Sequence, residues 1–89
     1  MSSPFKVRLK HARNENGLSQ KKLGILAGLD EFVASSRMNH YETGRHTPEF
    51  EVIKKIAEVL DLPVAYFYCE EDWLADEIIM LWQSRSRSQ

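Results

Sequence analysis

The sequence has no long hydrophobic run, a single cysteine and a net charge close to zero. Its apolar runs are only a few residues long, far short of the roughly 20 residues that a membrane-spanning helix needs. The stretch from Met1 to Lys6 lacks the apolar segment of a secretory signal. Cys69 cannot form an internal disulfide, which agrees with a reducing compartment. We therefore expect a cytoplasmic protein with no membrane partner.

Catalytic and cofactor-binding signatures are also missing. The chain contains no phosphate-binding loop, dinucleotide fingerprint or serine-hydrolase motif. The histidines His11, His40 and His46 show no metal-ligand spacing with Cys69. The acidic run at residues 70–72 is explained by the dipole of the helix that it begins. We expect no catalytic site, metal, cofactor or small-molecule substrate, and therefore a binding protein rather than an enzyme.

Charge is distributed unevenly along the 89 residues, a length that suits one domain. Residues 1–48 hold eight Lys and Arg against four acids, a balance of +4. Residues 49–89 hold four against nine, a balance of −5. This asymmetry suggests a basic working face on the first half and a separate role for the second half. The alternative is that these charged residues are scattered by chance over a solvated surface and have no binding role.

Hydrophobic periodicity predicts an all-α chain, with no alternating strand pattern and no internal repeat. Helices are expected over 4–16, over 20–27, up to residue 43, from 47 to 60, after residue 63 and from 70 to 83. Ser19 is a good N-cap for the second helix. Gly24 in its middle costs about 1 kcal/mol relative to alanine, which indicates that another helix packs closely there. Thr47 and Pro48 are a start signal for the fourth helix, with Phe50 on its apolar face.

Two segments, Leu18–Gly24 and Arg37–Pro48, are the most informative. They combine a small residue within the second helix, Gly28 after it, apolar Met38 and Tyr41, and an aromatic-Glu-Thr-Gly-Arg run that ends at residue 45. Residues 56–60 and 63–67 continue the pattern. The ordered series resembles the Cro/XRE (phage-repressor-like) family of helix-turn-helix transcriptional regulators. Residues 30–32 and 37–39 also resemble the short controller proteins of restriction-modification systems.

The resemblance implies a five-helix phage-repressor-like DNA-binding domain over residues 1–69. The periodicity adds a C-terminal amphipathic helix over 70–83, and the alternation of Ser and Arg over 84–89 predicts a disordered tail. Ten positions separate Gly28 from Met38, about four more than is usual in the family, which is about one helical turn. These extra residues either lengthen the recognition helix at its start or enlarge the loop before it.

A recognition helix over about residues 35–43 is expected to enter the major groove of double-stranded DNA. Since Met38 and Tyr41 point inward, the polar residues left to read bases are Ser35, Ser36, Arg37, Asn39 and His40. Arg37 could fork onto guanine and Asn39 onto adenine, although the position of Asn39 often faces away from the bases in the family. Phosphate contacts are expected from Gln20 and Arg45, supported by Lys21, Lys22, Arg13, Thr43 and His46. The alternative is that the residues predicted to contact bases are merely solvated side chains on a surface helix.

The C-terminal helix carries more large apolar residues than an exposed helix normally does. Its wide apolar surface consists of Trp73, Leu74, Ile78, Leu81 and Trp82. This surface either covers the core of its own chain or forms a dimer interface, since large aromatics are the usual anchors of interfaces. A homodimer would place two recognition helices about 34 Å apart on a palindromic site.

The leading hypothesis is therefore a transcriptional regulator, a homodimeric repressor or autoregulator on short palindromic operators. A second hypothesis is an antitoxin-type repressor that also binds a toxin, in which case a small unrelated protein should co-purify with it. A third is a protein-interaction adaptor that uses the fold without DNA. The adaptor predicts that no salt-sensitive DNA binding is found.

Overall fold

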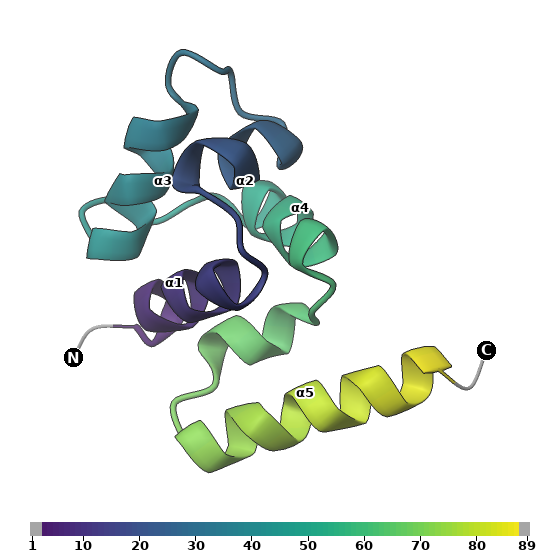
Figure 1. Cartoon of the computed structure of the whole chain (residues 1–89). Helices are drawn as coiled ribbons and strands as arrows, with labels where there is room; N and C mark the ends of the chain where they lie inside the picture. The colour runs from purple at the N-terminus through teal and green to yellow at the C-terminus, as the bar shows by residue number, and fades with distance from the viewer. Residues whose placement is uncertain (1–2, 88–89) are drawn as a thin grey trace.

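The computed structural model describes residues 3–87, which form five α-helices and one 3-10 helix with no strand among them (Figure 1). The helices are α1 (Phe5–Glu15), α2 (Gln20–Leu26), α3 (Ala34–Thr43), α4 (Phe50–Leu60), the 3-10 helix η1 (Val64–Tyr68) and α5 (Asp72–Arg87). The all-α prediction is confirmed. Over this part of the chain, none of the helices has the length and apolar character needed to cross a bilayer.

Helices α2 and α3 pack against each other at a glycine. The Ser19 hydroxyl caps α2 by accepting a hydrogen bond of 3.0 Å from the Lys22 amide. One turn later, a Cβ atom added to Gly24 would lie only 2.8 Å from the Cβ atom of Ala34. The close helix packing that the sequence predicts at Gly24 is therefore present, and its partner is the first residue of α3.

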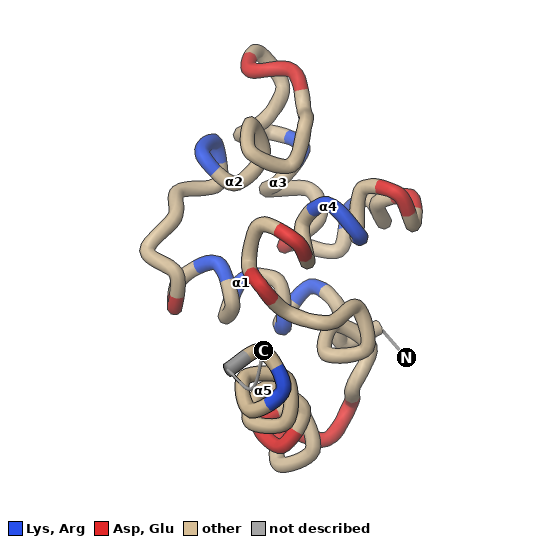
Figure 2. The backbone as a smooth tube through the Cα atoms, turned by 90° about the vertical axis from the view of Figure 1, so that its right-hand side faces the viewer, with Lys and Arg blue, Asp and Glu red and all other residues tan. Residues whose placement is uncertain are grey.

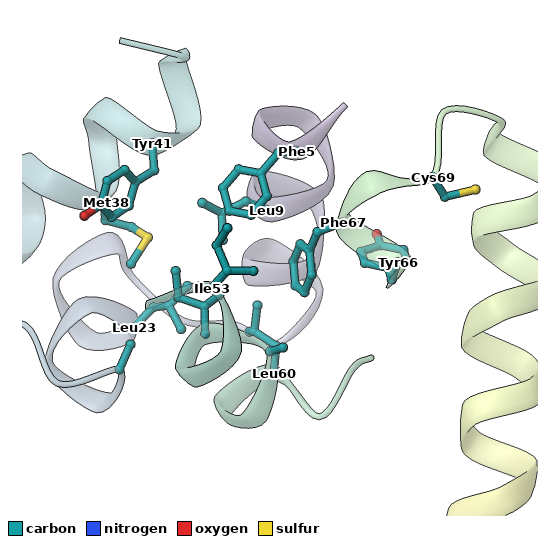
Figure 3. Close-up of a cluster of buried hydrophobic side chains, with 14 of the residues drawn as sticks. Phe5, Leu9, Leu23, Met38, Tyr41, Ile53, Leu60, Tyr66, Phe67 and Cys69 are labelled. Carbon is teal, nitrogen blue, oxygen red and sulfur yellow. The ribbon is translucent and has the colours of Figure 1, made fainter. Parts of the chain in front are cut away.

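The core lies where α1, α2, α3, α4 and η1 converge (Figure 3). Each helix contributes residues from one stripe, since the side chains that share a helical face recur every three to four positions. The least exposed large side chains are Leu9, Leu23, Met38, Ile56, Tyr66 and Phe67. Helix α3 is thus fixed to the domain through Met38 and Tyr41, both buried.

Buried Arg8 joins α1 to the beginning of α5. Its Nε donates to the Cys69 carbonyl at 3.0 Å, and its Nη2 donates to the Glu70 carbonyl at 3.2 Å. Its Nη1 lies 3.0 Å from Oδ1 of Asp72, the first residue of α5. The guanidinium therefore satisfies two carbonyls of the turn that leads into α5 and holds that turn against α1.

Helix α5 lies beside η1, away from the α2–α3 loop (Figure 1). Ala75 is buried, and Ile78 and Ile79 pack against the core of the same chain. The Trp82 indole donates a hydrogen bond of 3.2 Å to Oδ1 of Asp61, the residue that ends α4. Part of the predicted apolar surface, including Ile78 and Trp82, is therefore engaged within the chain.

The other side of α5 remains exposed. Trp73 is 67% exposed, and Met80 and Leu81 are each 62% exposed. Leu74 lies at the edge of this side, with 36% exposure. We call Trp73, Leu74, Met80 and Leu81 the outer face of α5. The inner side of α5 thus covers the core of its own chain, and the outer face is exposed in the described part of the chain.

Two expectations about helix ends are wrong. Residues 84–87 continue α5 instead of forming a disordered tail, since no Gly or Pro follows Trp82 to stop the helix. Residues 88–89, also assigned to the tail, lie outside the described residues. Helix α4 begins at Phe50 after an extended Glu49, so Pro48 belongs to the loop. Phe50 is 57% exposed and does not join the core.

Candidate nucleic-acid interface

The exposed side of α3 is polar from its first turn. Ser35, Ser36, Arg37 and Asn39 are exposed, and His40 is half-buried. On the opposite side, Ala34 and Met38 have no exposed surface. The five residues that the sequence predicts to read bases therefore share one helix with a fixed inner side, and the serines and Arg37 occupy its leading end. Helices that read the major groove use residues at this end.

The extra residues between Gly28 and Met38 enlarge the loop before α3. The helix begins at Ala34, only four positions before Met38. The loop begins with Gly28 at a φ of +93° and contains a hydrogen bond of 3.0 Å from the Val33 amide to the Asp30 carbonyl. The structure thus places the extra residues in the loop and leaves α3 to begin at Ala34.

Glu42, on the inner side of α3, holds the helix against α1. Its carboxylate accepts hydrogen bonds from Nε and Nη2 of Arg13, the second at 3.0 Å. Arg13 also donates from Nη1 to the Leu18 carbonyl at 2.8 Å. The hydrogen bonds with Glu42 raise the pKa of the Arg13 guanidinium above its ordinary value. The Arg13 side chain, which the sequence predicts to contact phosphate, is thus only 11% exposed and is bound to Glu42 inside the protein.

Gln20 connects α2 to the same network. Its Nε2 lies 3.2 Å from Oδ1 of Asn39 and 3.2 Å from Oε1 of Glu42. The side chain at the start of α2 therefore fixes the rotation of α3 about its axis. Asn39 accepts one hydrogen bond from Gln20 with its oxygen, which leaves its amide nitrogen and the second lone pair of the oxygen for a ligand.

A family model described as a helix-turn-helix domain matches residues 6–66, from the first turn of α1 into η1. The chain belongs to the helix-turn-helix family. The match agrees with the Cro/XRE-like resemblance. The narrower controller type stays a prediction.

A solved structure of the transcriptional regulator BswR is similar to this helix-turn-helix protein. The two sequences are 50% identical, and the match covers 88% of this chain and 77% of BswR with a TM-score of 0.84. A search of curated proteins found no match. The match to BswR covers more of this chain than the family model does, since the family model ends at residue 66.

Two histidines meet near the C-terminal end of α3. The rings of His40 and His46 stack with centroids 4.9 Å apart and planes 17° apart. Loss of solvent around the ring lowers the pKa of His40, and the nearby charges of Arg45 and His46 lower it further. The Thr43 hydroxyl donates to the His40 carbonyl at 3.3 Å. His40, predicted to read bases, thus lies together with Thr43 and His46, both predicted to contact phosphate.

Basic side chains of the helix-turn-helix protein border this surface. Lys21, Lys22 and Arg45 are exposed, and Figure 2 shows Lys and Arg along α1, α2 and α4. Sequence reasoning missed Lys6, whose Cδ would lie 3.2 Å from a Cβ atom added to Gly44. Lys6 therefore lies against Gly44, in the turn after α3. Its charge was visible in the sequence, but its position depends on the packing of α1 under that turn.

A groove runs along α3 toward the start of α4. Val33, Ser36, Arg37 and His40 line it on the α3 side, and residues 46–49 and Val52 line it on the α4 side. Within residues 3–87, no three His, Cys, Asp or Glu side chains gather in a way that could hold a metal ion. The polar and aromatic groups of the groove therefore offer hydrogen bonds and stacking to a ligand.

Proposed function

We propose that this chain is a sequence-specific DNA-binding transcriptional regulator that places the leading end of α3 in the major groove. One observation carries the proposal, which is the row of exposed Ser35, Ser36 and Arg37 on a helix locked from behind by Glu42. Short polar side chains on a rigid helix can reach base edges without losing much conformational freedom. The similarity to BswR, a transcriptional regulator, supports the same role.

The proposed regulator acts as a homodimeric repressor in the cytoplasm and binds palindromic operators. The outer face of α5 supplies the surface for the second copy, because Trp73, Met80 and Leu81 remain more than half exposed there. This face lies at the end of the molecule away from the α2–α3 loop (Figure 1). Association through α5 therefore leaves both recognition helices uncovered. Two copies related by a two-fold axis would read two half-sites about one helical turn apart.

The experiment that tests this function is selection of binding sites from a random duplex pool at two salt concentrations, with the mass of the recovered complex measured. A palindrome bound by two copies supports the regulator and its dimer together. Weak binding that has no sequence preference and vanishes with salt contradicts the proposal. No DNA binding at all would favour the adaptor, and a co-purifying small protein would favour the antitoxin type.

Alanine substitutions at Arg37 and Arg45 should separate base reading from phosphate binding. Arg37→Ala is expected to relax the preference at one base pair, a loss of about 1–3 kcal/mol of discrimination. Arg45→Ala is expected to weaken binding to every duplex and to reduce the salt slope by about one unit. Titrations of the selected site and a scrambled site at several salt concentrations measure both effects. Equal loss of preference in the two variants would contradict this division of roles.

A charge on the outer face of α5 should dissociate the dimer. Leu81→Glu is expected to weaken association by about tenfold or more, since a buried leucine contributes about 1.5–3 kcal/mol. Sedimentation over a range of concentrations measures the change. Val7→Glu on α1 is the matched control, because Val7 is 60% exposed and lies outside the proposed interface. A Leu81→Glu variant that remains as dimeric as the control rules out this interface.

A further inference from the structure

The loop between α2 and α3 presents an aromatic side chain to solvent. Phe32 is 90% exposed, more than any other large hydrophobic side chain among residues 3–87. It precedes Ala34, the first residue of α3, by two positions. Phe32 therefore lies just before the N-terminal end of α3, the helix that carries Ser35 and Ser36. The preceding loop residues, Asp30 and Glu31, are acidic, and the loop contains no Lys or Arg.

Hydrogen bonds and packing hold this loop in place. The Asp30 carboxylate accepts a hydrogen bond of 2.8 Å from the Phe32 amide. At the base of the loop, the Leu29 amide donates to the Gly24 carbonyl at 2.9 Å, and the Leu29 side chain packs against the core. The loop backbone that leads into Phe32 is thus held by hydrogen bonds, while the Phe32 ring itself is exposed.

We propose that Phe32 is a specificity-determining residue that packs on thymine 5-methyl groups at the edge of the half-site read by α3. The inference rests on the proposed function, since it requires α3 in the major groove. Apolar side chains read thymine through its methyl group, which projects into that groove. The neighbouring Val33 already lines the groove that Ser36, Arg37 and His40 share, so the apolar surface of the loop continues into the polar surface of α3.

The composition of the loop distinguishes this role from a phosphate contact. Asp30 and Glu31 would repel phosphate, and their segment brings no positive charge to the backbone of DNA. The loop can therefore contribute apolar contact but not counterion release. Phe32→Ala is expected to lower affinity for the selected site by about tenfold, as for a well-buried aromatic contact, while the salt slope stays unchanged.

The test replaces single thymines of the selected site with uracil, which removes only the 5-methyl group. The wild-type protein should lose about fourfold in affinity at one or two positions, as expected for burial of one methyl group. Phe32→Ala should bind the thymine and uracil duplexes equally at those positions. Phe32→Leu keeps an apolar side chain and should restore part of the discrimination. Phe50→Ala, which removes another exposed phenylalanine at the start of α4, should keep the wild-type pattern.

Two outcomes separate failure of this inference from failure of the proposed function. If the wild-type protein selects a site and Phe32→Ala matches it in affinity and in sensitivity to every uracil, Phe32 does not read thymine. If Phe50→Ala loses the same sensitivity, the effect is not specific to the loop and the inference is also wrong. If the wild-type protein selects no site, the proposed function itself fails, whatever Phe32 does.

Discussion

Glu42→Ala is expected to lower the free energy of unfolding by about 3–5 kcal/mol, the range for breaking one partner of a buried ion pair. The Glu42 side chain is only 3% exposed and that of Arg13 is 11% exposed. The substitution leaves the Arg13 guanidinium away from water with only the Leu18 carbonyl as its acceptor. It also removes one of the two acceptors of Gln20. Because these bonds join α1, α2 and α3, affinity for the selected DNA should fall as well.

Urea titration followed by helical circular dichroism measures the loss of stability. Glu58→Ala is the matched control, since Glu58 is an exposed glutamate on α4 and its loss should change stability by about 0.5 kcal/mol or less. The double variant Arg13→Met, Glu42→Leu should recover much of the loss, because apolar pairs often replace buried ion pairs without net cost. A single Glu42→Ala variant as stable as the Glu58→Ala control would show that the ion pair does not hold α3 in place.

The helices could be predicted because their signals are local. The hydrophobic periodicity and the Ser19 cap each act within one or two turns of chain. Gly44 indeed ends α3 in the left-handed conformation, with a φ of +79°. The close approach at Gly24 could also be inferred, since a glycine inside a helix lowers its stability unless packing requires it. Each of these signals lies within a few residues of the helix feature that it predicts.

The role of the arginines could not be predicted, because it depends on partners distant in the sequence. Arg13 pairs with a glutamate 29 positions away, and Arg8 with an aspartate 64 positions away. In the sequence, both resemble the exposed Lys21 and Lys22, so Arg13 was assigned to phosphate. Only the fold shows that these two guanidinium groups bind partners inside the protein, whereas Lys21 and Lys22 are exposed.

The exposed side of α3 could be predicted in part. The order of residues in α3 was enough to place Ser35, Ser36 and Arg37 on its exposed side, since Met38 and Tyr41 fix the inner side. The sequence could not decide whether the extra residues belong to the helix or to the loop, because Asp30 and Val33 suit either one. Hydrogen bonds within the loop and the contact between Ala34 and Gly24 decide the matter.

Gly24→Ala is expected to destabilise the protein and to weaken DNA binding, although alanine is the better helix former by about 1 kcal/mol. The added Cβ would lie 2.8 Å from the Ala34 Cβ and 3.0 Å from the Ala34 carbonyl oxygen. A backbone atom cannot move aside as a flexible side chain can, so α2 and α3 must separate. Overpacking of this kind costs about 1–3 kcal/mol. The displacement moves Ser35 and Ser36, which follow Ala34 directly, relative to Gln20.

Gly17→Ala distinguishes loss of geometry from loss of stability. Gly17 has a φ of +66°, so alanine is strained there by roughly 1–2 kcal/mol, but nothing lies within 4 Å of its added Cβ. This control should therefore lower the melting temperature and leave the affinity of the folded protein unchanged. Gly24→Ala should bind DNA more weakly at temperatures where it and Gly17→Ala are both folded. Adding Ala34→Gly to Gly24→Ala should restore part of the affinity, because it removes the nearest contact of the new Cβ. If both glycine variants bind the selected site equally well, the spacing of α2 and α3 does not control DNA binding.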